Sequence, residues 1–132
     1  MNWRRWIFRG VNGLLAPLFL FFAVVQVNDP DPARWMAIYL AAALACALEL
    51  TGRLRWPLPT LVALAAGIWA GLWAPGVVGQ VDWGHALAGA GMDADPRGEE
   101  ARELVGLGLV AVWCAVLALA SLSRGQAASR AR

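Results

Sequence analysis

Four long runs without charged residues alternate with short polar segments along this chain of 132 residues. The uncharged runs are residues 10–28, 35–48, 56–81 and 104–123. A helix needs about 20 apolar residues to cross the hydrocarbon core of a bilayer, and a backbone in lipid must satisfy its hydrogen bonds internally. The pattern therefore predicts an all-α membrane protein with four transmembrane helices. Their expected ranges are 10–27, 33–52, 57–75 and 97–123.

The composition agrees with this pattern and limits the domain organisation. Hydrophobic residues make up 60% of the chain, well above the usual share in soluble domains. The length fits one domain, so residues 1–132 are expected to form a single compact bundle of four helices. Arg4, Arg5 and Arg9 resemble the start of a signal peptide, but the apolar run that follows is too long and lacks a small-residue cleavage site. A retained membrane anchor is the better interpretation.

The arginines divide unequally between the two sides of the predicted membrane. Eight lie with the termini and the loop after span two: Arg4, Arg5, Arg9, Arg53, Arg55, Arg124, Arg130 and Arg132. The other two loops hold only Arg34, Arg97 and Arg102, but they hold eight of the nine acidic residues. Because arginine-rich loops stay in the cytoplasm, both termini are predicted to be cytoplasmic. The basic rim suits anionic lipid headgroups, and no nucleic-acid partner is expected.

The chain contains no lysine and is rich in alanine and glycine. This bias favours a bacterial source, and hence the cell inner membrane. Small residues recur every fourth position on span two and span three: Ala37, Ala41 and Ala45, and Ala63, Gly67 and Gly71. Such faces allow close helix approach. They could pack within the monomer, against another membrane protein or in a homo-oligomer.

Other residues within the runs lead to local predictions. Pro75-Gly76 should end span three, so residues 77–92 become a glycine-rich segment that lies on the surface or re-enters the membrane. Glu49 and Arg53 have the spacing of a helical ion pair. Trp35 falls at a membrane interface, where an amphipathic indole is favoured.

A dense polar segment, residues 26–35, separates the first two runs. Asp31-Pro32 is typical of an N-cap followed by the first helical residue, and Asp95-Pro96 repeats this pattern before span four. Acids at the start of span four, from Glu99 onward, suit the positive end of the helix dipole. Caps and dipoles thus give most of these acids a structural explanation.

Two segments resemble the signature of the transmembrane protein 220 family. The first, Phe22 to Trp35, closes span one and opens span two; the second, Glu99 to Leu107, opens span four. Tyr39, one helical turn after Trp35, also fits the first signature. The resemblance implies a small four-helix integral membrane protein, and it carries no assigned reaction.

Both segments should lie at the same membrane level, on the extracytoplasmic side. They would form one polar cluster: Gln26, Asn28, Asp29, Asp31, Trp35, Glu99, Arg102 and Glu103. Arg102 is expected to contact Asp29 or Asp31 through charge-assisted hydrogen bonds. The remaining oxygens suit Ca²⁺, Mg²⁺ or a cationic headgroup. Asp82 and His85 are weaker metal candidates, because a lone interfacial histidine is more often simply solvated.

Three functions stay open. The pattern favours a structural or accessory membrane protein whose extracytoplasmic polar cluster locks the helix ends. The alternative is a protein that binds a cation, a lipid headgroup or a small molecule at those carboxylates, or a metal-assisted enzyme. No catalytic set or cofactor motif points to a specific reaction. A transporter-like oligomer comes third, because the spans offer few polar residues to line a path.

Overall fold

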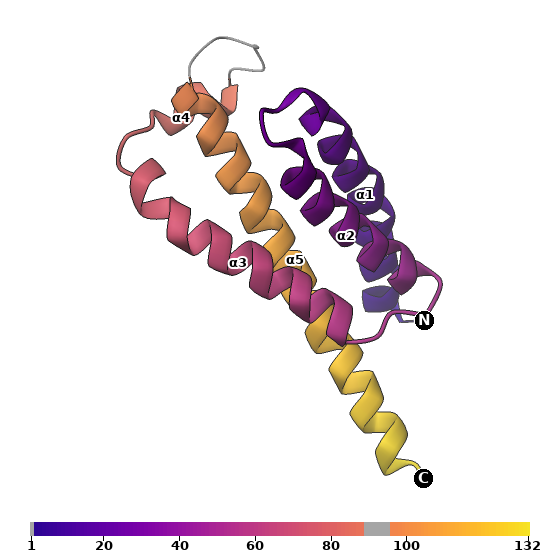
Figure 1. Cartoon of the computed structure of the whole chain (residues 1–132). Coiled ribbons are helices and arrows are strands. Elements are labelled where there is room, and N and C mark those ends of the chain that lie inside the picture. Colours follow the sequence, from indigo (N-terminus) through magenta and orange to yellow (C-terminus); the bar gives the residue numbers. More distant parts are fainter. Residues whose placement is uncertain (1, 89–95) are drawn as a thin grey trace.

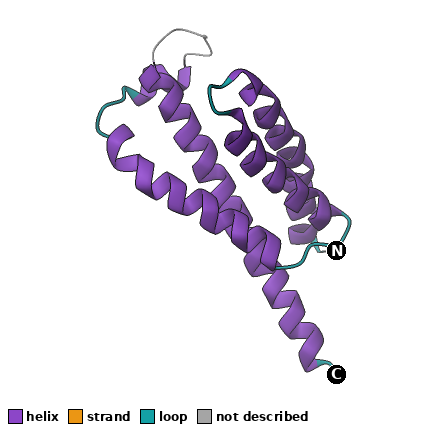
Figure 2. Cartoon of the chain, viewed as in Figure 1, coloured by secondary structure: helices purple, strands orange, loops and turns teal. Residues whose placement is uncertain are grey.

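The computed structural model describes residues 2–88 and 96–132, which are almost entirely helical. The four long helices are α1 (Trp3–Val25), α2 (Pro32–Leu50), α3 (Pro57–Val77) and α5 (Pro96–Arg130). Two short helices lie in the connections: the 3-10 helix η1 (Gln26–Asn28) and α4 (Trp83–Ala88). The four long helices are long and apolar enough to cross a membrane, so the predicted fold class is confirmed (Figures 1 and 2).

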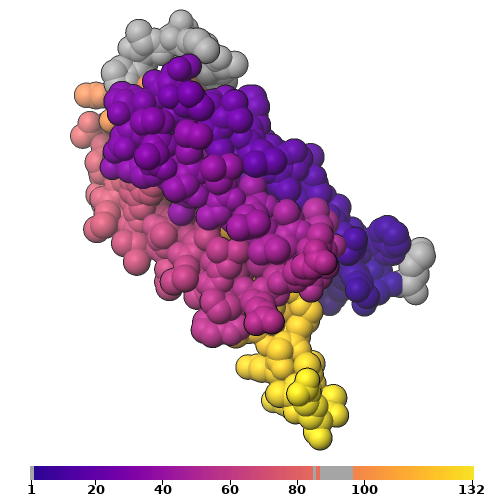
Figure 3. Space-filling model, turned by 45° about the vertical axis from the view of Figure 1, so that its right-hand side comes forward, coloured from indigo at the N-terminus to yellow at the C-terminus, as the bar shows by residue number. Residues whose placement is uncertain are grey.

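The long helices form two pairs. α1 packs along α2, α3 packs along α5, and α2 joins the pairs through contacts with α3 and α5. Figure 1 shows α5 between α3 and the α1–α2 pair. The C-terminal part of α5 projects past the other helices, at the end of the bundle where α1 begins (Figures 1 and 3).

Several helix ends differ from the prediction. α1 begins at Trp3, before the expected Gly10, because nothing prevents the arginine-rich start from being helical at headgroup level. α3 continues through Pro75 to Val77. A proline so near the end of a helix removes one hydrogen bond, and Val77 is held by packing with Ala86 and Ala101. α5 runs on to Arg130, past the predicted end at 123.

The segment after α3 is partly described. α4 packs against α5, and Ala86 of α4 is buried. Residues 89–95, including the predicted cap Asp95, lie outside the described residues. Whether residues 77–92 lie on the surface or re-enter the membrane stays a prediction.

The core lies on the faces that the long helices share. Its largest fully buried side chains include Phe19 of α1 and Leu107 and Leu117 of α5. Other faces expose large apolar side chains, among them Leu14, Leu61, Leu72 and Leu119, as expected of surfaces in contact with lipid. A Cβ added at Gly67 would lie 3.9 Å from the Cβ of Ala111. The small-residue face of α3 therefore packs at this position against α5 of the same chain.

Candidate functional site

Three carboxylates converge where the α1–α2 connection meets the start of α5. Asp29 follows η1, whereas Glu99 and Glu103 lie one turn apart on α5. One oxygen from each residue lies within 4.8 Å of the others. Asp29 and Glu103 are half-buried and Glu99 is exposed. We call these three residues the carboxylate cluster.

Local hydrogen bonds hold Asp29 in place. Its N–H donates to the carbonyl of Gln26 at 3.0 Å, and its Oδ1 accepts the N–H of Asp31 at 2.8 Å. A hydrogen bond from the backbone N–H of one residue to the aspartate side chain two positions earlier defines an Asx turn. The turn brings the chain from η1 into α2, and it explains part of why an aspartate occupies position 29.

Asp31 occupies the N-cap position of α2, as predicted, but its side chain makes no capping hydrogen bond. Its Oδ2 instead pairs with Nε of Arg34 at 2.9 Å. The predicted cap is therefore confirmed in position and wrong in its hydrogen bond. The carboxylate of Asp31 serves its own helix, whereas that of Asp29 faces α5.

The cluster is electrostatically demanding. Two unit charges about 5 Å apart repel by about 3 kcal/mol at the effective dielectric constant of a protein surface. One carboxylate oxygen of Asp29 and one of Glu103 lie within 4.8 Å of each other. Carboxyl groups that meet in this way are stabilised when they share a proton or bind a cation.

Tyr39 of α2 packs against Gly106 of α5, just inside the cluster. The tyrosine is only 2% exposed, and a Cβ at Gly106 would collide with its hydroxyl. Gly106 comes one helical turn after Glu103 on α5. The two segments that resemble a family signature therefore meet at the cluster, and Tyr39, one turn after the first segment, contacts Gly106 of the second.

The contact between Tyr39 and Gly106 was missed by the sequence reasoning, although both residues were within or beside the quoted segments. A glycine in the run of leucines and valines that opens span four is a signal of close helix approach. Its partner could not be read from the sequence, because the partner depends on how the two helices are rotated against each other.

Trp35 is not grouped with the carboxylate cluster: it packs against aromatic side chains of α3. It is 3% exposed, and its ring lies 4.3 Å from that of Trp69 and 5.7 Å from that of Trp73, measured between centroids. The membrane level of this residue stays a prediction, but its indole is covered by the chain itself. The helical phase of α2 turns Trp35 toward α3, where it packs in the core.

The other predicted residues are more dispersed. Gln26 is half-buried and Asn28 is exposed. Arg102 donates from Nη1 to the carbonyl of Ala86 at 3.3 Å, which ties α5 to α4. Its predicted partner Asp31 is paired with Arg34 instead; the contact between Arg102 and Asp29 stays a prediction. The weaker metal candidates, Asp82 and His85, stay a prediction. Asp82 is exposed, and the side chain of His85 lies outside the described residues.

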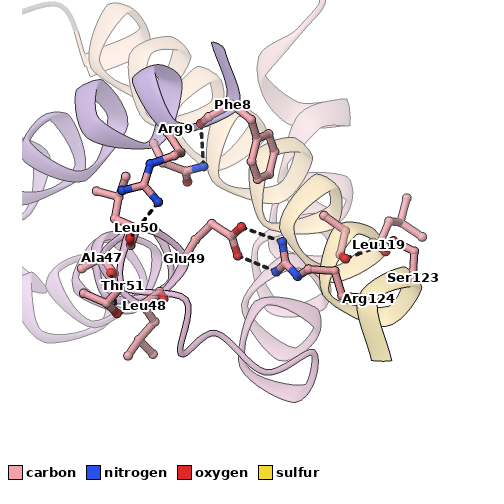
Figure 4. A network of polar contacts seen from close by, with 12 residues as sticks. Phe8, Arg9, Ala47, Leu48, Glu49, Leu50, Thr51, Leu119, Ser123 and Arg124 are labelled. Carbon is pink, nitrogen blue, oxygen red and sulfur yellow. Dashed lines mark hydrogen bonds and ion pairs between the residues drawn. The ribbon is translucent and has the colours of Figure 1, made fainter. Parts of the chain in front are cut away.

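A second polar network lies at the opposite end of α2 and α5 (Figure 4). Both terminal nitrogens of Arg124 donate to the two carboxylate oxygens of Glu49, each at 2.7 Å. Arg9 donates to the carbonyl of Leu50 at 3.2 Å. The predicted pair of Glu49 with Arg53 is wrong, because α2 ends at Leu50 and the chain turns away before Arg53.

Asn12 forms a buried polar link between α1 and α5. It is fully buried; its Nδ2 donates to the carbonyl of Phe8 at 2.9 Å, and its Oδ1 accepts the indole N–H of Trp113 at 3.1 Å. Both ends of the amide are satisfied within the chain. Asn12 is therefore explained by packing and needs no ligand.

A comparison with protein families gives one match that covers most of the chain. The model of the family described as "Transmembrane family 220, helix" matches residues 18–119. The matched region contains the carboxylate cluster and the contact between Tyr39 and Gly106. No solved structure matches the chain.

Proposed function

The chain belongs to the transmembrane 220 family, whose function is not known, and we propose that it is a structural or accessory protein of the bacterial inner membrane. In this proposal both termini are cytoplasmic and the carboxylate cluster lies on the extracytoplasmic side. The partition of the arginines supports this orientation. The cluster then joins the extracytoplasmic ends of the two helix pairs.

The observation that carries the proposal is the meeting of Asp29 with Glu99 and Glu103. Asp29 belongs to the connection within the α1–α2 pair, and the two glutamates belong to the α3–α5 pair. A second contact between the two helix pairs lies one turn further along α5, where Tyr39 of α2 packs against Gly106. When its carboxyl groups share a proton or bind a cation, a junction of this kind holds the helix ends in one arrangement, which suits a protein that presents a fixed surface to a membrane partner.

Cysteine cross-linking in native membranes tests the junction. In a background of Cys46→Ala and Cys114→Ala, the pair Asp29→Cys and Glu103→Cys should form a disulfide on mild oxidation. The matched control is Asp31→Cys with Glu103→Cys, which should cross-link less because the side chain of Asp31 turns toward Arg34. Equal yields from both pairs, or none from the first, would contradict the junction.

The orientation has its own test. A reporter enzyme that is active only in the periplasm, fused after Arg132, should be inactive. The same reporter inserted at Gly79, between α3 and α4, should be active. The opposite result for either fusion would rule out cytoplasmic termini.

Cation binding is the second candidate function. The three converging oxygens favour it, because hard divalent cations are bound by sets of carboxylate oxygens. A cationic lipid headgroup would use the same charges.

A further inference from the structure

The connection between α2 and α3 carries an arginine on each side of a buried leucine. Leu54 is 8% exposed and belongs to the core, whereas Arg53 and Arg55 are both exposed. The backbone N–H groups of Arg53 and Leu54 donate to the carbonyl of Leu48, at 2.8 and 3.1 Å. The last turn of α2 and the buried leucine therefore fix the backbone from which the two arginines extend.

A third arginine reaches the same end of α2 from α1. Arg9, itself exposed, donates from Nη1 to the carbonyl of Leu50 at 3.2 Å (Figure 4). This bond uses one nitrogen of the guanidinium and holds its charge beside the turn that leads to Arg53. Trp56, which follows Arg55, is 51% exposed, as suits an indole at headgroup level. We call Arg9, Arg53 and Arg55 the arginine group.

The acid at this end of the bundle already has a partner. Glu49 is the only acidic residue between Asp31 and Asp82, and Arg124 binds both of its carboxylate oxygens at 2.7 Å. Asp31 precedes α2 and Asp82 follows α3, so both belong to the opposite end. An anion that neutralises the arginine group has to come from outside the chain.

An exposed apolar face of α2 leads to the arginine group. Leu40, Leu44 and Ala47 are exposed, and their spacing of four and three residues places them on one side of the helix. The exposed Thr51 continues this face into the turn before Arg53. The part of α2 from Leu40 to its end is about 15 Å long, which is half of a hydrocarbon core of about 30 Å. One acyl chain can lie along this face.

We propose that the arginine group binds the phosphate of an anionic phospholipid, with an acyl chain along the exposed face of α2. A guanidinium binds phosphate through two parallel charge-assisted hydrogen bonds, and basic sites between membrane helices bind anionic headgroups. A zwitterionic lipid also carries a phosphate, but three arginines repel its ammonium group. The proposal assigns the lipid to three arginines among the eight at this end of the bundle, and it does not depend on the carboxylate cluster.

The test uses the full-length protein, freed of lipid, in an uncharged detergent. Phosphatidylglycerol should raise the melting temperature, because a ligand of the native state stabilises it. Phosphatidylcholine at the same concentration should have a clearly smaller effect, because its headgroup has no net charge. Inorganic phosphate at that concentration should have no effect, because it lacks the acyl chain.

Two double variants that remove the same charge make the test specific. Arg53→Gln with Arg55→Gln should weaken phosphatidylglycerol binding at least about tenfold, measured by native mass spectrometry. Arg130→Gln with Arg132→Gln is the matched control. These residues lie on the part of α5 that projects past the other helices (Figure 1), so binding should change less than about twofold.

Three results would overturn the proposal. Equal stabilisation by phosphatidylcholine would show that the net charge of the lipid is not recognised. An equal loss of binding in both double variants would show that general charge attracts the lipid. A full effect of inorganic phosphate would show that the arginines bind a free anion and that α2 holds no acyl chain.

Discussion

Acidic side chains have opposite surroundings at the two ends of α2 and α5. Near the C-terminal end of α2, Glu49 meets the guanidinium of Arg124 with two hydrogen bonds. Beyond its N-terminal end, Asp29 meets two further carboxylates. The 19 residues of α2 separate these sites by about 28 Å. A closed ion pair needs nothing from outside the chain, whereas converging acids respond to protons and cations, so the second end is where solution conditions should matter.

The largest expected effect comes from filling the contact that supports the carboxylate cluster. Gly106→Ala would place a Cβ against the hydroxyl of Tyr39. Overpacking of this kind costs about 1–3 kcal/mol, so the melting temperature in detergent should fall clearly. Gly108→Ala is the matched control, since a Cβ there meets nothing within 4 Å, and it should be neutral or slightly stabilising. Equal melting temperatures for both variants would contradict the close contact.

At the other end, Arg124→Ala should also destabilise. It would leave the carboxylate of Glu49, whose side chain is only 9% exposed, without its bidentate partner. The cost should be about 1–2 kcal/mol, because Arg124 itself is half-exposed and water can partly replace it. Arg130→Ala, in the exposed last turn of α5, should change little. Adding Glu49→Gln to Arg124→Ala should restore part of the stability, and no recovery would show that packing, not charge, is lost.

Replacing one glutamate by glutamine at each end should change the melting temperature in opposite directions. With divalent ions chelated at pH 7, Glu103→Gln should raise the melting temperature, since it relieves repulsion and its amide can donate to Asp29. Glu49→Gln should lower it under the same conditions, because it removes a charge-assisted pair. Partial exposure limits the gain to about 0.5–1 kcal/mol. A lower melting temperature for Glu103→Gln in chelator would mean that the cluster is already neutralised within the chain.

The sequence predicted the fold well because run length and hydropathy are local properties. It also identified Asp29, Glu99 and Glu103, as members of a larger set. It could not predict which members meet, nor that Glu49 would bind Arg124, because those pairings depend on how helices far apart in sequence are rotated and where they end. Trp35 illustrates this: a tryptophan near a span boundary can face lipid or core, and only the helical phase of α2 decides.

The smallest expected effect concerns the neighbour of the cluster. Asp31 and Arg34 form a pair whose side chains are 53% and 59% exposed, and exposed pairs of this spacing contribute at most about 0.5 kcal/mol. Asp31 makes no capping hydrogen bond that Asp31→Asn could remove, so the melting temperature should hardly change. The two aspartates of this connection differ by two positions and carry the same charge. If Asp31→Asn nevertheless changed the melting temperature as much as Asp29→Asn does, general charge at this end of the bundle would be responsible. A difference between the two variants would instead trace the effect to the one carboxylate that faces α5.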